Sequence, residues 1–91
     1  MTLREIEREV RVAGVKDIKV GWMWNDEGEM TVTARVWNGM GHWLRDYSIS
    51  VSRTEWHAKT RYWARRKNLK AIQQSMYREM RDMLLRYAEE A

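Results

Sequence analysis

Three runs of alternating apolar and polar residues occupy the middle of this 91-residue chain, and they constrain its fold more than any other feature. They cover residues 18–24, 29–37 and 43–51. Such alternation places apolar side chains on one face of a β-strand. Residues 25–28 and 38–41, rich in Asn and Gly, supply the turns between the runs. Three strands joined by two short turns predict an antiparallel meander.

A helical pattern precedes the first run. Thr2 and Glu5 form a capping-box pattern, and the apolar residues that follow recur at helical spacing. Gly14 with the apolar Val15 after it is typical of a helix stop. We therefore expect a helix over about 3–13.

A longer helical pattern follows the third run. Residues 52–55 repeat the capping-box pattern, and an apolar stripe continues to Tyr87. One helix over about 54–89 fits this stripe. Two helical segments with a bend near Lys67 and Asn68 are favoured, because Asn is a poor interior helix residue and a tolerable new cap.

These elements predict a single α+β domain over residues 1–91, in the order α-β-β-β-α. The three-stranded antiparallel meander is packed on one face by a short N-terminal helix and a long C-terminal helix. The shared periodicity predicts that the following side chains are mostly buried: Ile18, Val20, Trp22, Val32, Val36, Tyr47, Ile49, Leu69, Ile72, Met76 and Met80.

The other face of the predicted sheet is mostly polar but contains three large apolar side chains. Met23, Trp37 and Leu44 lie on it with Arg35, and neighbouring strands would bring them together. An exposed apolar cluster with a polar rim marks a contact surface. We interpret Met23, Arg35, Trp37 and Leu44 as a protein contact patch. The alternative is a sheet covered by its own loops or by the C-terminal helix.

The positive charge of the chain is concentrated in residues 53–70, the basic segment. This segment holds seven Lys and Arg residues against the single acid Glu55, whereas the whole chain has a net charge of +4. Aromatic side chains lie between the cations, where they could stack on unpaired bases or support Arg. The alternative is a solvated helix face with its aromatic residues in the core. The residues predicted to bind a nucleic acid or an acidic partner are Lys59, Arg61, Tyr62, Trp63, Arg65, Arg66, Lys67 and Lys70.

No group of residues indicates catalysis or a bound metal. His42 and His57 are the only histidines, and neither has another ligand at metal-binding spacing. The chain has no cysteine, and it contains no nucleophile-elbow or phosphate-loop pattern. We expect a protein that is not an enzyme and has no metal, no cofactor and no small-molecule substrate.

Two partial resemblances agree with binding. The segment from Met30 to Lys70 (MTVTARVW…TEWHAKTRYWARRK) is similar to the arm-type DNA-binding domains of phage integrases, which implies a sheet that enters a DNA groove. The order α-β-β-β-α with bases at the start of the last helix is also similar to a double-stranded-RNA-binding domain. In character, a small chain with six Trp and seven Met resembles bacteriophage accessory proteins such as anti-CRISPR inhibitors. That resemblance implies inhibition of a host ribonucleoprotein.

The sequence therefore predicts a small binding protein that docks on a nucleic acid or on a nucleic-acid-handling ribonucleoprotein complex. The alternative is a homodimeric protein-interaction module whose charge is incidental. No apolar run approaches the roughly 18 residues that span a bilayer, so no membrane partner is expected. We expect a cytoplasmic location, in the host cell if the chain is phage-encoded.

Overall fold

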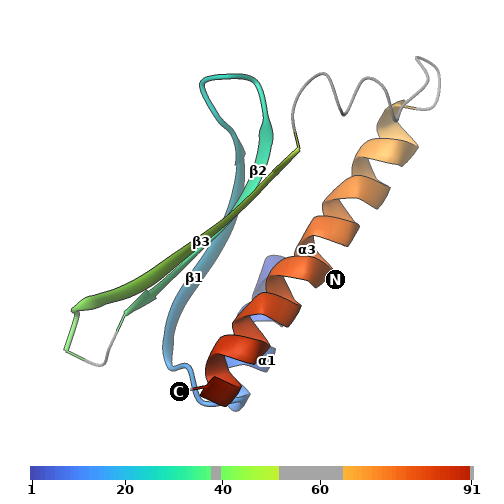
Figure 1. Ribbon diagram of the computed structural model, residues 1–91. Coiled ribbons are helices and arrows are strands. Elements are labelled where there is room, and N and C mark those ends of the chain that lie inside the picture. The colour runs from blue at the N-terminus through green and yellow to red at the C-terminus, as the bar shows by residue number, and fades with distance from the viewer. Residues whose placement is uncertain (38–39, 52–64, 91) are drawn as a thin grey trace.

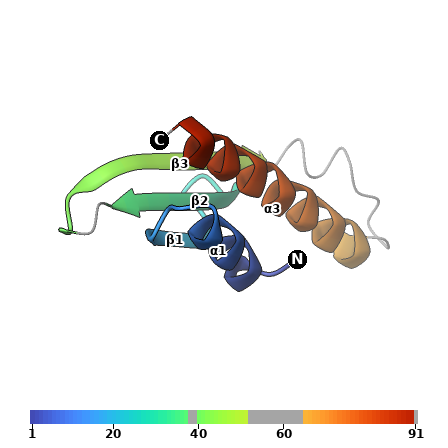
Figure 2. The same ribbon diagram turned by 90° about the horizontal axis from the view of Figure 1, so that it is seen from below.

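The computed structural model describes residues 1–37, 40–51 and 65–90, and describes only the backbone of Trp43 and residues 65–68. It contains helix α1 (Leu3–Val12), strands β1 (Asp17–Trp24), β2 (Met30–Trp37) and β3 (Trp43–Val51), and helix α3 (Arg65–Glu90). The strands form one antiparallel sheet in the order β1-β2-β3 (Figure 1). Both helices lie on one face of this sheet (Figure 2). The predicted α+β class and element order are confirmed.

Both ends of α1 follow from local chemistry. The Thr2 hydroxyl accepts a hydrogen bond of 3.1 Å from the Glu5 amide, which satisfies one of the free donors of the first turn. At the other end Gly14 has φ +118°, a conformation that L side chains rarely adopt. The turn lets the Val15 amide donate to the Val10 carbonyl at 3.1 Å and buries the Val15 side chain. The predicted start and stop of this helix are confirmed.

The turn between β1 and β2 is organised by one asparagine. The Asn25 Oδ1 atom accepts from the amides of Glu27 at 3.0 Å and Glu29 at 2.9 Å. The backbone amide of Asn25 in turn donates to the backbone carbonyl of Glu29 at 2.9 Å, which closes the hairpin. The short Asn25 side chain thus accepts hydrogen bonds from the backbone two and four residues later. These bonds fix the conformation of the turn, which strand pairing alone would not determine.

Replacing Asn25 by alanine is expected to lower the free energy of unfolding by about 1 kcal/mol, because two backbone amides lose their acceptor. Urea denaturation followed by circular dichroism measures the change. Asp26→Ala, at an exposed position of the same turn, is the control and should stay within about 0.5 kcal/mol of the parent. Equal effects of the two substitutions would contradict this role of Asn25.

The core lies between the sheet and the two helices. Val32 is 0% exposed, whereas Ser48 on the opposite face is exposed, so the predicted register is correct. Four of the side chains predicted as core are half-buried and pack against it: Tyr47, Ile49, Leu69 and Ile72. Six others are buried: Ile18, Val20, Val32, Val36, Met76 and Met80.

Trp22 is an exception, and its predicted burial is wrong. Trp22 is 39% exposed and Trp24 is 45% exposed. Their rings are in an edge-to-face arrangement, with the ring centroids 6.4 Å apart. The ten residues of α1 span about 15 Å, whereas the eight residues of β1 span about 26 Å. The carboxylate of Glu7 accepts from the Val20 amide at 2.9 Å, so α1 covers the first half of β1. The tryptophans lie toward the hairpin, in the second half of the strand.

Helix α3 is longer than the sheet and continues through the position where a new helix was expected. Its 26 residues pass through Lys67 and Asn68 without a break, so the predicted new start at Asn68 is wrong. The helix tolerates one Asn because its C-terminal half is held by packing, with Met80 and Leu84 both at 0% exposure. The first predicted segment, from residue 54 onward, lies outside the described residues as far as residue 64.

Candidate functional site

The sheet face turned away from both helices, the open face, is built from alternate residues of the three strands (Figure 2). The register pairs Lys19 with Arg35 and Gly21 with Thr33 between β1 and β2. Across β2 and β3 it pairs Thr33 with Ser48. Within the described part of the chain, no helix packs on this face. It is therefore a surface of the sheet that the described helices leave available to a partner.

A hollow of about 460 Å³ lies in the open face. Charged and apolar side chains rim it, and small ones form its floor. The residues that line it include Lys19, Gly21, Met23, Thr33, Trp37 and Ser48.

Gly21 lines the hollow without a side chain to fill it, and no feature of the described fold requires a glycine there. Its φ lies outside the left-handed region, and the ladder between β1 and β2 continues through it without a bulge. A Cβ atom on Gly21 would meet only the Thr33 hydroxyl, 4.0 Å away. Glycine inside a strand costs stability, and it marks places where a bulge, a bend or a ligand needs room. The ladder here has no bulge, so what the glycine provides on this face is room in the hollow.

The four residues of the predicted contact patch lie at or near this hollow. Met23 is 55% exposed and Trp37 is half-buried, and both line the hollow with Arg35. Leu44 is 53% exposed but does not line it, because the ladder between β2 and β3 shifts register next to Trp37. The Arg35 guanidinium pairs with the Asp46 carboxylate at 3.0 Å, which offsets its charge.

Thr31 departs from the expected solvent-facing character of this face. It is 6% exposed, and its hydroxyl lies 3.0 Å from that of Ser50 on β3 and donates to the Glu29 carbonyl at 3.3 Å. The paired hydroxyls close the face at the hairpin end. The hollow is therefore open from Met23 toward Trp37 and not beyond.

The predicted basic site falls mainly outside the described side chains. Lys59, Arg61, Tyr62 and Trp63 lie outside the described residues. The backbone of Arg65, Arg66 and Lys67 forms the start of α3, a first turn without any acid. Lys70 is exposed one turn later. This end of α3 extends past the sheet on the side where β3 ends, away from the end of the sheet that carries Trp37 (Figure 1).

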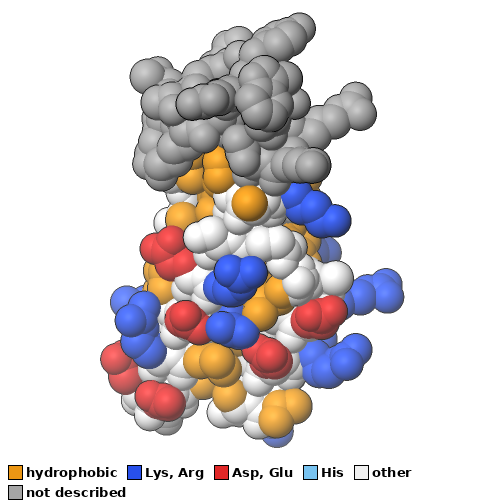
Figure 3. Space-filling model, turned by 90° about the vertical axis from the view of Figure 1, so that its right-hand side faces the viewer, with side chains coloured by type: hydrophobic (Ala, Val, Ile, Leu, Met, Phe, Trp, Pro, Cys, Tyr) orange, Lys and Arg blue, Asp and Glu red, His pale blue; other side chains and the backbone are white. Residues whose placement is uncertain are grey.

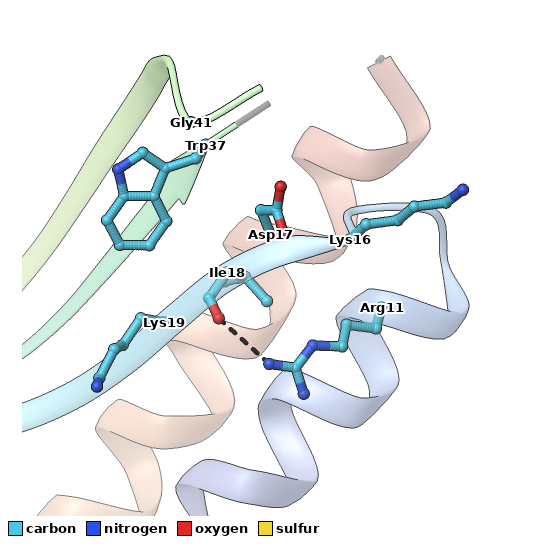
Figure 4. Close-up of a pocket in the computed structure, with 7 residues that line it drawn as sticks. All are labelled: Arg11, Lys16, Asp17, Ile18, Lys19, Trp37 and Gly41. Carbon is cyan, nitrogen blue, oxygen red and sulfur yellow. Dashed lines mark hydrogen bonds between the residues drawn. The ribbon is translucent and has the colours of Figure 1, made fainter. Parts of the chain in front are cut away.

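A second group of cations, which the linear sequence does not reveal, lies at the Trp37 end. Arg11 of α1, Lys16 of the following turn and Lys19 of β1 line an open pocket of about 420 Å³ with the Trp37 ring (Figure 4). Asp17 is the one acid in this lining. We call it the cationic pocket. Arg11, Lys16 and Lys19 are separated by acidic and apolar residues along the chain, so no charge run marks them.

The helix side of the molecule differs in its charge pattern. Viewed from α3, basic and acidic side chains alternate over the surface (Figure 3). The Arg81 guanidinium lies 3.8 Å from Glu9 and 3.2 Å from Asp82. Burial raises the pKa of the Tyr77 hydroxyl, in keeping with its place in the core. Mixed signs of this kind are typical of a solvated face.

Comparison with protein-family models, curated proteins and solved structures finds no match to this chain. Among the residues that the structure describes, no three potential metal ligands gather at one place. No helix within that part of the chain combines the length and the apolar character needed to cross a membrane. The candidate binding surfaces are the open face, the basic segment and the cationic pocket.

Proposed function

We propose that this protein is a non-enzymatic binding protein that holds a nucleic acid, free or within a ribonucleoprotein, against the open face of its sheet. The observation that carries the proposal is the hollow around Gly21, with the Lys19 cation and the Trp37 ring on its rim. An inhibitor of a ribonucleoprotein, as the resemblance to phage proteins implies, would use the same surface.

The chemistry of the hollow favours unpaired bases. Thr33 and Ser48 place hydroxyl groups on the floor, and each hydroxyl both donates and accepts hydrogen bonds. No hydrogen bond to either hydroxyl occurs within the described part of the chain. The edges of unpaired bases carry donors and acceptors, and their faces stack on aromatic rings. A surface with both features suits a single strand better than the backbone of a duplex.

The charge distribution supports the same partner. The start of α3 at Arg65 lies toward one end of the sheet, and Lys19 with the cationic pocket lies at the other. Cations toward both ends of the molecule would follow the phosphates of an extended strand that crosses the sheet. On the helix side of the molecule, acidic side chains lie among the basic ones, so that surface has no uniform charge (Figure 3).

The direct test is fluorescence anisotropy with labelled single-stranded and double-stranded DNA and RNA, at salt concentrations from about 50 to 200 mM. We expect single strands to bind most tightly, and log K to fall linearly with log salt as counterions are released. Binding to none of the four nucleic acids at 50 mM salt would refute the proposal.

A graded series at Gly21 separates binding from folding. Gly21→Ala and Gly21→Val should raise the free energy of unfolding by about 0.5–1 kcal/mol, because both residues prefer a strand to glycine. The same side chains fill the hollow, so affinity for single strands should fall progressively, about tenfold or more for valine. Thermal unfolding and anisotropy measure the two effects. A more stable Gly21→Val protein with unchanged affinity would show that the strand does not enter the hollow.

Self-association is the second candidate. Trp22, Met23 and Trp24 form an exposed apolar run on β1, an edge strand of the sheet. Exposed apolar edge strands pair readily with other chains. A homodimer formed there would be nearly indifferent to salt, whereas phosphate binding would not. Light scattering at 50 and 500 mM salt, with Trp24→Lys as the disrupting variant, distinguishes the two candidates.

A further inference from the structure

We propose that the cationic pocket is a nucleotide site, in which Lys16 and Lys19 hold a phosphate group while the attached base stacks on Trp37. This inference rests on the proposed function, because it names the part of the strand that the Trp37 end of the sheet receives. It concerns residues of three different elements that the fold brings together (Figure 4).

The two lysines have charges that the described fold does not use. Neither Lys16 nor Lys19 forms an ion pair within the part of the chain that the structure describes, and both are exposed. Figure 4 draws the two side chains pointing away from each other, so their flexible stems would turn inward when both hold one phosphate. The charge of Arg11 is offset by Glu7, so the two lysines against the Asp17 carboxylate leave the pocket lining with an excess of one positive charge.

Arg11 has a different role from the lysines. Its guanidinium lies 3.6 Å from the Glu7 carboxylate and makes a long hydrogen bond of 3.5 Å to the Ile18 carbonyl (Figure 4). It thereby joins α1 to the outer edge of β1. Its charge is offset by Glu7 and its guanidinium contributes to packing α1 on β1, so Arg11 is a poor choice for mutation.

Trp37 identifies the ligand as a nucleotide rather than as an acidic peptide. The indole ring lies on the same side of β1 as Lys19, at the end of β2 (Figure 4). An acidic peptide would need the cations alone, whereas a nucleotide also uses an aromatic surface. Lys19 and Trp37 line both this pocket and the hollow around Gly21, so a strand could continue from one into the other.

Removing the Asp17 charge should change the affinity in the opposite direction to removing a lysine charge. Its carboxylate lies in the pocket lining, opposite Trp37 in the ladder between β1 and β2. A like charge near a phosphate weakens binding, and removing it should strengthen binding. A pocket that merely contributed to folding would not show this increase.

The test compares three single variants by anisotropy with a single-stranded oligonucleotide. Lys16→Glu should weaken binding about tenfold or more and lower the salt slope by about 0.7–0.9. Asp17→Asn should strengthen it about twofold to fivefold. Arg78→Glu, at an exposed position of α3 on the other side of the molecule, changes the net charge as much as Lys16→Glu and should have less than half its effect on log K.

Several outcomes would overturn the nucleotide site while leaving the proposed function intact. Equal effects of Lys16→Glu and Arg78→Glu would mean that net charge, and not the pocket, governs affinity. Weaker binding by Asp17→Asn would contradict a phosphate beside that carboxylate. Equal affinity for poly-glutamate and for the oligonucleotide would assign the pocket to acidic peptides.

The phosphate in the pocket could belong to a nucleic-acid strand or to a free nucleotide. Titration with a nucleoside 5′-monophosphate distinguishes these two sources. We expect amide NMR shifts at residues 16–19 and 41 with the monophosphate and much smaller shifts with the nucleoside, and Trp37→Ala should reduce them. Such shifts without any oligonucleotide binding would retain the site, with a free nucleotide as its ligand, and refute the proposed function. No shifts in these amides with either the monophosphate or the oligonucleotide would refute the site.

Discussion

Replacing Arg65 and Arg66 together by glutamate is expected to weaken the binding of single-stranded nucleic acid on the order of a hundredfold, about 3 kcal/mol. Two cations that would face phosphates become anions that repel them. The salt slope should fall by about 0.7–0.9 for each phosphate that the variant no longer neutralises. Anisotropy at several salt concentrations measures both quantities.

Folding should survive this double substitution. Glu and Arg have similar helix propensities, and the first turn of α3 contains no acid, so added carboxylates would interact favourably with the N-terminal end of the helix. Arg78→Glu combined with Arg86→Glu, at two exposed positions of the same helix, is the control for net charge. Unchanged affinity of the folded Arg65→Glu, Arg66→Glu protein at low salt would leave the open face and the cationic pocket as the remaining candidate surfaces.

Met80→Ala is expected to lower the free energy of unfolding by about 2–5 kcal/mol, the largest stability effect predicted for this fold. Met80 is 0% exposed in a core shared by both helices and the sheet, so its truncation leaves a cavity. A domain of this size has on the order of 5–15 kcal/mol of stability in all. The variant should therefore unfold at a much lower urea concentration.

Met80→Leu preserves most of the volume and should cost less than about 1.5 kcal/mol. Arg78→Ala, exposed on the same helix, should cost less than about 0.5 kcal/mol. If Met80→Ala destabilises the protein no more than Arg78→Ala does, the packing of α3 against the rest of the core has been misidentified.

Periodicity predicted the fold well where one face of an element is uniformly buried. Val32 and Val36 alternate with polar residues on a central strand, and both their strand and their face were predicted correctly. The errors occurred where burial depends on the reach of a neighbour. Trp22 has the phase of a core residue, but α1 is too short to cover it. Asn68 has a poor helix propensity, which tertiary packing of α3 overrides.

The candidate site could be predicted only in part. Met23 and Trp37 were assigned to the open face from alternation, and the structure places both beside one hollow. The role of Gly21 could not be read from the chain, because a strand glycine has meaning only when its neighbours across the sheet are known. Arg35 was assigned to the contact patch, and only the register between β2 and β3 reveals that Asp46 lies beside it and offsets its charge.

The sequence by itself determined the order of the elements, the faces of the strands and the concentration of charge in residues 53–70, because these properties depend on residues near one another in the chain. The tertiary structure alone decided the cationic pocket and the hollow. Arg11 and Trp37 are far apart in sequence, and they come together only because α1 packs along the edge of β1 and β2 pairs with that strand. Local patterns record what each residue prefers, whereas a binding site depends on distances that only packing sets.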